Sequence, residues 1–289
     1  MLERRRSRAA GPSGPPDYIG VGGEGTGAGW WHALLLAHPE IRAPRPRALD
    51  FFGAFCEREL QEADVTRYRA HFRRRHGAIS GEWTERYMLD GWVPPLLRRV
   101  APGAKLLVML ADPIECYRAS FAERSAQRAG GGSVTIGDAA DRRNYASQLA
   151  RLRRFYDPDS ILVLQYERCR QDTLGEYRRT LRFLGVRDDF VPWRLRDAAG
   201  PAEALSASAL RRIPLGPPAR ARALTRLTGR PQRTAALWPD VEVALRATFD
   251  PEVEALRALV PELELSLWPN FAQPRAAQPP SGERTARTA

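Results

Sequence analysis

Residues 18–39, YIGVGGEGTGAGWWHALLLAHP, carry the pattern that decides the fold. Tyr18 to Gly22 is a short apolar run, which predicts a buried strand. A glycine-rich turn follows from Gly22 to Gly29, and a helix is predicted from about Trp30 to Ala37, where the pair His38-Pro39 ends it. In this order of elements, backbone N–H groups at a helix N-terminus can converge on a phosphate group. A flexible strand–helix turn has the same glycine content, so the turn alone does not decide between the two interpretations.

Two further strand–helix units follow along the chain. The run KLLVML, Lys105 to Leu110, is continuously apolar, as expected for a strand buried on both faces, and Asp112-Pro113 then provide an N-cap and a first-turn proline for a helix. Ser160 to Gln165 is another buried run, which leads to a helix over Thr173–Leu184 that Gly185 ends. Alternating strands and helices predict an α/β fold with a parallel sheet flanked by helices on both faces and a P-loop-like phosphate-binding turn.

The remaining segments add helices and two polar ends. Segment 200–234 has no clear periodicity and is predicted to form loops and short helices. The ends, 1–16 and 273–289, lack large apolar residues and are predicted to be disordered tails, which leaves a single domain over 17–272. Further helices are predicted in three ranges, of which the last is an extra C-terminal helix: 86–100, 138–155 and 239–260.

The charge of the chain favours an anionic ligand without identifying it. Lys plus Arg number 45 against 34 Asp plus Glu, a net charge of +11, and Lys105 is the single lysine. Arginine side chains bind phosphate and sulfate oxygens in pairs, and a basic surface also suits nucleic acid or a membrane. The arginines are spread along the chain rather than clustered with aromatic residues, so no specific nucleic-acid partner is expected.

The cysteines and histidines give no sign of a metal site. The three cysteines are far apart and form no CxxC pair, and the four histidines have no tight ligand spacing, so neither a disulfide framework nor a metal is expected. The basic start MLERRRSRAA is followed by glycine and proline instead of an apolar segment, which argues against a secretion signal. No apolar run approaches membrane-spanning length, and a cytoplasmic protein is expected.

The order of several motifs resembles the bacterial sulfotransferases. Members of that family open with a strand, a loop of the type GxQ[K/R]xGT[S/T] and a helix that ends at an HP pair, and the chain keeps this pattern with Gly27, Trp30-Trp31 and His38-Pro39. Further similar segments follow in the family's order: RALDFF (47–52), SGEWTERYM (80–88), LVMLADPIECYRAS (107–120), LVLQYERC (162–169) with Phe183-Leu184-Gly185, and LSLWPNF (265–271). Each segment alone is weakly specific, and their joint order over residues 18–271 is what makes the resemblance specific.

The resemblance implies transfer of a sulfuryl group from phosphoadenosine phosphosulfate (PAPS), without a metal, to a hydroxyl or amine. The chemistry requires a cation at the oxygen where charge develops, donors that hold the 3′-phosphate, and a base for the acceptor's proton. In the family a loop Lys or Arg supplies the cation. An Arg of an RDP motif and a nearby Ser hold the phosphate, and a Glu or His is the base.

The chain departs from the family at each of these positions. Losing the phosphate contacts could weaken donor binding by about a thousandfold, because a charge-assisted hydrogen bond contributes about 1.5–3 kcal/mol. Loss of the transition-state cation is expected to reduce the rate by a further ~100-fold or more. The positions that carry the family's loop cation, loop hydroxyl, glutamate, arginine and serine are here Gly25, Ala28, Ala48, Ala111 and Ala119.

Substitutes for the missing groups can be named. The predicted catalytic residues are Arg47, which matches a lysine of the family, and Asp50, which stands where many members have a histidine. Asp50 is equally explained as a capping or surface carboxylate. Arg118 is better explained as a solvated arginine on a helix of an arginine-rich chain. The predicted cofactor-binding residues are Gly23, Gly25, Thr26, Gly27, Ala28, Gly29, Arg118 and Ser120.

Other polar residues near the motifs are given structural roles. Glu24 replaces a neutral glutamine and would repel a sulfate that it faced. Glu82 and Thr84 are predicted to organise a loop, and Tyr166-Glu167 to form a hydrogen-bond network at the carboxyl edge of the sheet. The pair Trp30-Trp31 is predicted to belong to the core.

Two functional hypotheses remain open at this point. The first is an active PAPS-dependent sulfotransferase with relocated cations. The second is a catalytically impaired relative that keeps the fold and acts as a binding or regulatory protein. The acceptor is a small molecule, glycan or lipid that no segment specifies, and the sequence does not define an oligomeric state.

Overall fold

The computed structural model describes residues 12–23, 25–44, 46–126, 136–192, 195 and 237–272. The predictions for Glu24, for segment 200–234 and for tail 273–289 lie outside these residues. The N-terminal tail was predicted too long, because Gly14 N–H donates to Phe72 O at 3.1 Å and Arg74 N–H donates to Pro12 O at 2.9 Å.

A five-stranded, fully parallel sheet forms the centre of the molecule, with strand order β2-β3-β1-β4-β5. Strands β4 and β5 confirm the two predicted buried runs, and β1 is shorter than the predicted strand. The two strands on the other side of β1 were not predicted. The bounds are β1 Tyr18–Gly20, β2 Ile41–Arg42, β3 Ile79–Trp83, β4 Lys105–Leu110 and β5 Ile161–Gln165.

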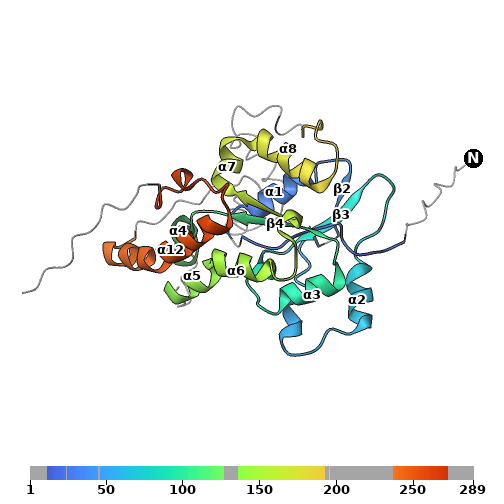
Figure 1. Ribbon diagram of the computed structural model, residues 1–289, viewed down its shortest axis with the longest axis horizontal. Coiled ribbons are helices and arrows are strands. Elements are labelled where there is room, and N and C mark those ends of the chain that lie inside the picture. The colour runs from blue at the N-terminus through green and yellow to red at the C-terminus, as the bar shows by residue number, and fades with distance from the viewer. Residues whose placement is uncertain are drawn as a thin grey trace, which may run out of the picture.

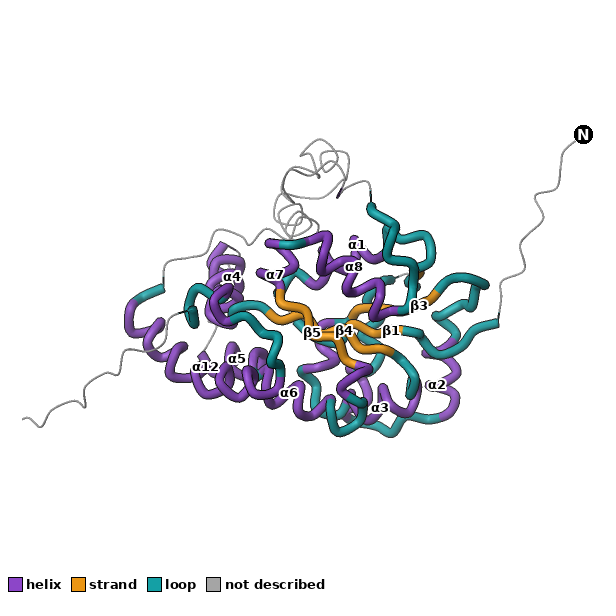
Figure 2. The backbone as a smooth tube through the Cα atoms, turned by 45° about the horizontal axis from the view of Figure 1, so that its top comes forward, coloured by secondary structure: helices purple, strands orange, loops and turns teal. Residues whose placement is uncertain are grey.

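Helices cover both faces of this sheet (Figures 1 and 2), as predicted for a parallel sheet without an exposed face. Alternate residues of β4 point to opposite faces, so Leu106 and Val108 belong to one buried cluster and Leu107 and Met109 to the other. One face packs on α1 (Ala28–Leu35) and α8 (Thr173–Leu184). The elements that pack on the other face are α2 (Glu62–Arg69), α3 (Val93–Val100), α6 (Tyr145–Leu152) and the C-terminal half of α12 (Pro239–Leu259).

Two long predicted helices are each divided in two. The range 86–100 contains a 3₁₀ turn, η2 (Glu85–Met88), and then α3, whereas 138–155 contains α5 (Ile136–Arg143) and α6. Asn144 adopts φ −74° and ψ 62°, which is not helical and therefore separates α5 from α6. The predicted C-terminal helix is confirmed as α12, and none of the described helices combines the length and apolar composition that a membrane crossing requires.

Loops at the carboxyl edge of the sheet bring distant segments together. Asp112 Oδ1 accepts hydrogen bonds from Ile114 N and Glu115 N, so it caps α4 (Pro113–Ala126) as predicted. Glu167, at the start of α7 (Tyr166–Gln171), accepts from Asp112 N at 2.9 Å through one oxygen and from Trp268 Nε1 at 2.9 Å through the other. This confirms a hydrogen-bond network around Glu167. It also connects residues 265–271, called the closing segment below, to the ends of β4 and β5.

Candidate functional site

The glycine turn that follows β1 is held in a fixed shape by its own threonine. Gly23, Gly25 and Gly27 have φ values of 90°, 77° and 82°, a region that favours glycine. The amide and hydroxyl of Thr26 donate to Gly23 O at 3.0 and 2.7 Å, and the hydroxyl also lies 3.3 Å from Met109 O. Thr26 therefore turns its side chain toward the sheet and stabilises the turn from within.

Helix α1 begins directly after this turn. Gly27 O accepts from Trp30 N at 3.0 Å and from Trp31 N at 3.2 Å, so the amides of Ala28 and Gly29 precede the first intrahelical bonds. Such first-turn N–H groups and the positive end of the helix dipole favour an anion. Trp30 and Trp31 are both buried, which confirms that they belong to the core.

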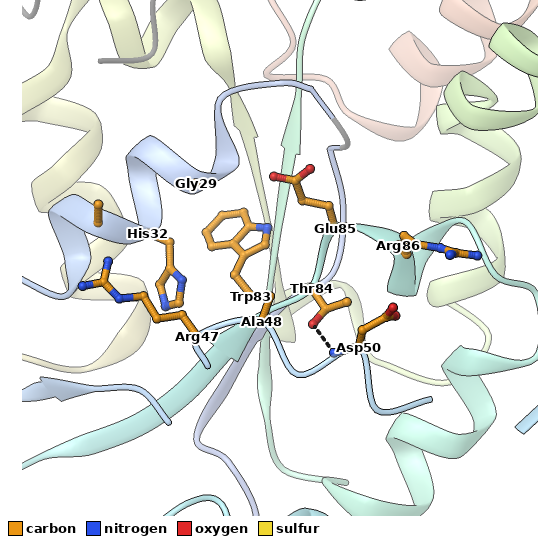
Figure 3. A pocket seen from close by; sticks show the side chains of 10 residues that line it. Gly29, His32, Arg47, Ala48, Asp50, Trp83, Thr84, Glu85 and Arg86 are labelled. Carbon is orange, nitrogen blue, oxygen red and sulfur yellow. Dashed lines mark hydrogen bonds between the residues drawn. The ribbon is translucent and has the colours of Figure 1, made fainter. Parts of the chain in front are cut away.

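A cavity of about 470 Å³ opens beside α1 (Figure 3). Three separate segments form its wall: the first half of α1, the loop that precedes Phe51, and the end of β3 with the residues that follow it. The sheet order explains this meeting, because β3 is the neighbour of β1 and both strands run in the same direction. The lining residues are Gly29, His32, Ala33, Arg47, Ala48, Asp50, Trp83, Thr84, Glu85 and Arg86.

Arg47 and Asp50, the two predicted catalytic residues, both line this cavity. Figure 3 shows the Arg47 side chain beside His32 and the Asp50 carboxylate beyond Thr84, with Trp83 between the two sides. Both side chains are exposed. Asp50 has φ 45°, the only positive value of a non-glycine residue in the described part of the chain. The structure thus brings a cation and a carboxylate to opposite walls of one cavity.

Three side chains at the end of β3 and in the residues that follow it fix the loop that carries Asp50. Thr84 Oγ1 accepts from Asp50 N at 3.2 Å, and Tyr87 Oη accepts from Phe51 N at 2.9 Å. Both hydroxyls donate to Glu82, which is fully buried and also accepts from Leu49 N at 2.9 Å. Burial raises the pKa of Glu82, although these hydrogen bonds oppose the shift. The prediction that Glu82 and Thr84 organise a loop is confirmed.

His32 is a cavity residue that the sequence did not indicate. Its Nε2 atom lies 3.1 Å from the Tyr18 hydroxyl, in hydrogen-bond contact. Burial, with a smaller contribution from the charge of Arg47, lowers the pKa of His32 to about 3. The imidazole is therefore neutral at physiological pH and adds no positive charge to the cavity. The signal that could have identified it is its helical position, one turn after Gly29.

Glu85 is the second cavity residue that the sequence did not indicate. Its Oε2 atom accepts from Gly25 N at 3.4 Å, so one carboxylate faces the glycine turn. The neighbouring Arg86 points out of the cavity in Figure 3, and it lies 3.5 Å from Asp90. A ligand anion at the turn would meet the negative charge of Glu85 before any charge of Arg86.

Arg118 and Ser120 lie on α4 and not among the residues that line the cavity. Arg118 is paired with Glu115 at 2.8 Å and with Glu242 at 3.0 Å, so both of its terminal nitrogens are already bound to carboxylates. Ser120 Oγ donates to Cys116 O at 2.9 Å and accepts from Arg143 Nη2 at 3.1 Å. Their role in cofactor binding stays a prediction, and Arg118 would have to leave two ion pairs to perform it.

Known proteins resemble the chain in structure but not detectably in sequence. No protein-family model matches the chain, and no curated protein matches it. A sulfotransferase from Alicyclobacillus acidocaldarius is 19% identical, with a TM-score of 0.62 over 87% of this chain and 98% of that one. Mouse sulfotransferase SULT7A1, solved in complex with PAP, is 10% identical, with a TM-score of 0.54 over 88% of this chain and 91% of that one. The chain therefore has the sulfotransferase fold, as its motif order predicted.

Proposed function

We propose that the chain is a sulfotransferase that moves a sulfuryl group from PAPS to a hydroxyl or amine of a small acceptor. The observation that carries the proposal is the cavity at the carboxyl edge of β1 and β3, where Arg47 and Asp50 lie on opposite walls beside the N-terminus of α1. In a chain with the sulfotransferase fold, this cavity supports a site for the transfer step. An open α/β sheet binds ligands at this same edge.

The proposed roles follow from the charge of each group. PAPS supplies an activated sulfuryl group whose release leaves negative charge on a phosphate oxygen. Arg47 stabilises that charge, and the first-turn amides of α1 bind the neighbouring anionic oxygens. Asp50 accepts the proton of the acceptor group as general base. The hydrogen bond from Asp50 N to Thr84 keeps the carboxylate on the side of the cavity opposite Arg47.

The residues fit the two ends of PAPS unequally. At the sulfuryl end, Gly25 leaves open space where a side chain would stand, and Arg47 supplies a cation. At the nucleotide end, Ala111 and Ala119 replace the arginine and serine that the family resemblance implies, and Arg118 is bound to two carboxylates. The fit therefore supports the transfer chemistry more strongly than tight nucleotide binding.

A catalytically impaired binding protein with the same fold is the second candidate. Glu85 favours it, because its carboxylate occupies the Gly25 amide that an anionic donor would use. Five replaced motif positions favour it as well. This candidate predicts nucleotide binding without transfer.

Two measurements separate the candidates. PAP or PAPS at millimolar concentration should raise the melting temperature of either protein, whereas transfer of labelled sulfate from PAPS to an acceptor panel requires the enzyme. Arg47→Met should lower the transfer rate by ~100-fold or more, and Asp50→Asn should lower it by ~100-fold.

The matched control is Arg86→Met, which removes an arginine that lines the same cavity but points out of it. This variant should keep the transfer rate within a factor of about 3. Nucleotide binding without any transfer would support the impaired relative. A wild-type melting temperature that no nucleotide changes would reject both candidates.

A further inference from the structure

Arg143 is an arginine buried against α4. It ends α5, and only 5% of its surface is exposed. Its Nη2 atom donates to Cys116 O and to Ser120 Oγ, each at 3.1 Å. Cys116 in turn directs its thiol toward Gly25 O at 3.9 Å, so the contact between Arg143 and α4 lies beside the glycine turn.

Two buried polar atoms in this region have no nitrogen or oxygen partner in the described structure. They are Nε of Arg143 and the hydroxyl of Tyr145, which begins α6, is 3% exposed and has only the Cys116 thiol beside it. Buried donors without acceptors are rare in native proteins, and each one indicates a missing water or ion or a functional role. Only Asn144, the non-helical residue between α5 and α6, separates Arg143 from Tyr145 in the chain.

No carboxylate in the described part of the chain lies within ion-pair distance of Arg143, and two acidic groups nearby, Asp112 and Glu167, act on the neighbouring Cys116. The acceptors of Arg143 are a backbone carbonyl and a hydroxyl of α4, whereas Arg118 on that helix is paired with two carboxylates. Burial raises the pKa of the neighbouring Cys116 to about 11 and that of Tyr145 well above its usual value, so both groups are neutral at physiological pH. A buried guanidinium without a directly paired carboxylate is unfavourable, which favours an anion from outside the chain.

We infer that Arg143, Tyr145 and Ser120 form a binding site for a phosphate or sulfate group. The guanidinium offers its free Nε–H and the tyrosine offers its hydroxyl, while the serine hydroxyl can turn from Cys116 O to the ligand. Tetrahedral oxyanions take this donor set, and the bonds to them are charge-assisted. The group is either a free inorganic ion or a phosphate of the nucleotide, and only in the second case does the inference rest on the proposed function.

Inorganic sulfate is the first probe. In the full chain at constant ionic strength, with chloride as the replacement, low millimolar sulfate should raise the melting temperature along a saturable curve, by about 3 °C or more at ten times the Kd. Arg143→Met should abolish the saturable part. Arg151→Met is the matched control, because Arg151 also has an unpartnered buried Nε but bonds two backbone carbonyls at Met88 and Leu89. It should keep the sulfate response.

Tyr145→Phe decides the case if Arg143→Met does not fold. The substitution removes only a hydroxyl without a nitrogen or oxygen partner, so a purely structural tyrosine predicts nearly unchanged stability and an unchanged sulfate response. The anion site predicts sulfate affinity roughly tenfold weaker. A saturable sulfate response that is identical in wild type, Tyr145→Phe and Arg143→Met would overturn the inference, as would its absence from the wild type.

Two nucleotides distinguish the sources of the group. If the site takes a nucleotide phosphate, PAP should compete with sulfate, and Tyr145→Phe should weaken PAP but not adenosine 5′-phosphate. If it takes a free ion, sulfate and PAP should bind independently. Sulfate binding without any nucleotide binding would support this site and reject the proposed sulfotransferase, so the two failures are distinguishable.

Discussion

The loop that carries Arg47 and Asp50 owes its shape to one buried carboxylate. Glu82 accepts four hydrogen bonds, from Leu49 N and from the hydroxyls of Tyr68, Thr84 and Tyr87. Two of these hydroxyls accept a bond from the loop in turn. A residue with no exposed surface therefore sets the position of an exposed one, Asp50, which no local sequence rule relates to it.

Removing the Glu82 carboxylate should strongly destabilise the fold. Glu82→Ala leaves several buried donors without an acceptor, so the free energy of unfolding should fall by about 3 kcal/mol or more. The control is Glu85→Ala, three residues further on and partly exposed, which should change it by less than about 1 kcal/mol. Urea denaturation measures both values, and equal effects would show that Glu82 is not the centre of the network.

At the scale of elements, the glycine turn joins β1 to α1 under two different constraints. Gly25 and Gly27 both have positive φ, but a Cβ at Gly25 would meet no atom within 4 Å, whereas one at Gly27 would lie 2.5 Å from the Tyr166 ring. The first position needs glycine for its backbone alone. The second also needs it because α7 begins directly against the turn.

The two glycines should therefore respond differently to alanine. Gly25→Ala should lower the free energy of unfolding by about 1–2 kcal/mol through the left-handed backbone. Gly27→Ala adds a steric conflict that should cost about 1–3 kcal/mol more. In a Tyr166→Ala background, the additional loss of unfolding free energy caused by Gly27→Ala should become smaller. If this additional loss is the same in both backgrounds, the tyrosine ring is not its cause.

The junction at Glu167 should give the protein a pH-dependent stability. Burial raises the pKa of Glu167 to about 7, with hydrogen bonds from Asp112 N and Trp268 opposing the shift. Because the folded pKa lies above the unfolded value near 4.3, ionisation costs more in the folded state. Stability should therefore decline from about pH 4.5 to pH 7, by up to about 3 kcal/mol.

Unfolding free energies at pH 5 and pH 8 test this, with Glu167→Gln as the variant. The decline should be smaller in the variant, which has no carboxyl group to ionise. The buried Glu82 also has a raised pKa and contributes a decline of the same sign that the variant keeps. A decline of equal size in both proteins would assign the effect to other groups.

At the scale of the whole molecule, the sequence predicted the elements that are continuous and missed those that depend on distant neighbours. The runs at 105–110 and 160–165 identify β4 and β5 because both of their faces are buried. Strand β3 contains Gly81 and the buried Glu82, a combination that predicts a turn from sequence alone. Only its pairing with β1 makes this segment a strand. Arg47 and Asp50 were found through motif order, whereas His32 and Glu85 reach the cavity only through the sheet order.

The stability of the sheet should depend on the closing segment, residues 265–271, near the C-terminal end of the domain. Trp268 has no exposed surface, packs in the cluster that joins the sheet to α3, α6 and α12, and donates Nε1–H to Glu167. Trp268→Ala should lower the free energy of unfolding by about 3–5 kcal/mol, since it leaves a cavity and an unpaired carboxylate oxygen. Trp238→Ala, which truncates a tryptophan that is 80% exposed, should change it by less than about 0.5 kcal/mol. If the chain is one domain over 17–272, near-UV and far-UV circular dichroism should report a single transition in both variants, shifted only in Trp268→Ala. The reason is that a core shared by the strands and the C-terminal helix cannot lose its central side chain and leave one part unaffected. Two transitions in Trp268→Ala, one of them at the wild-type midpoint, would contradict this and mean that part of the sheet folds without the closing segment.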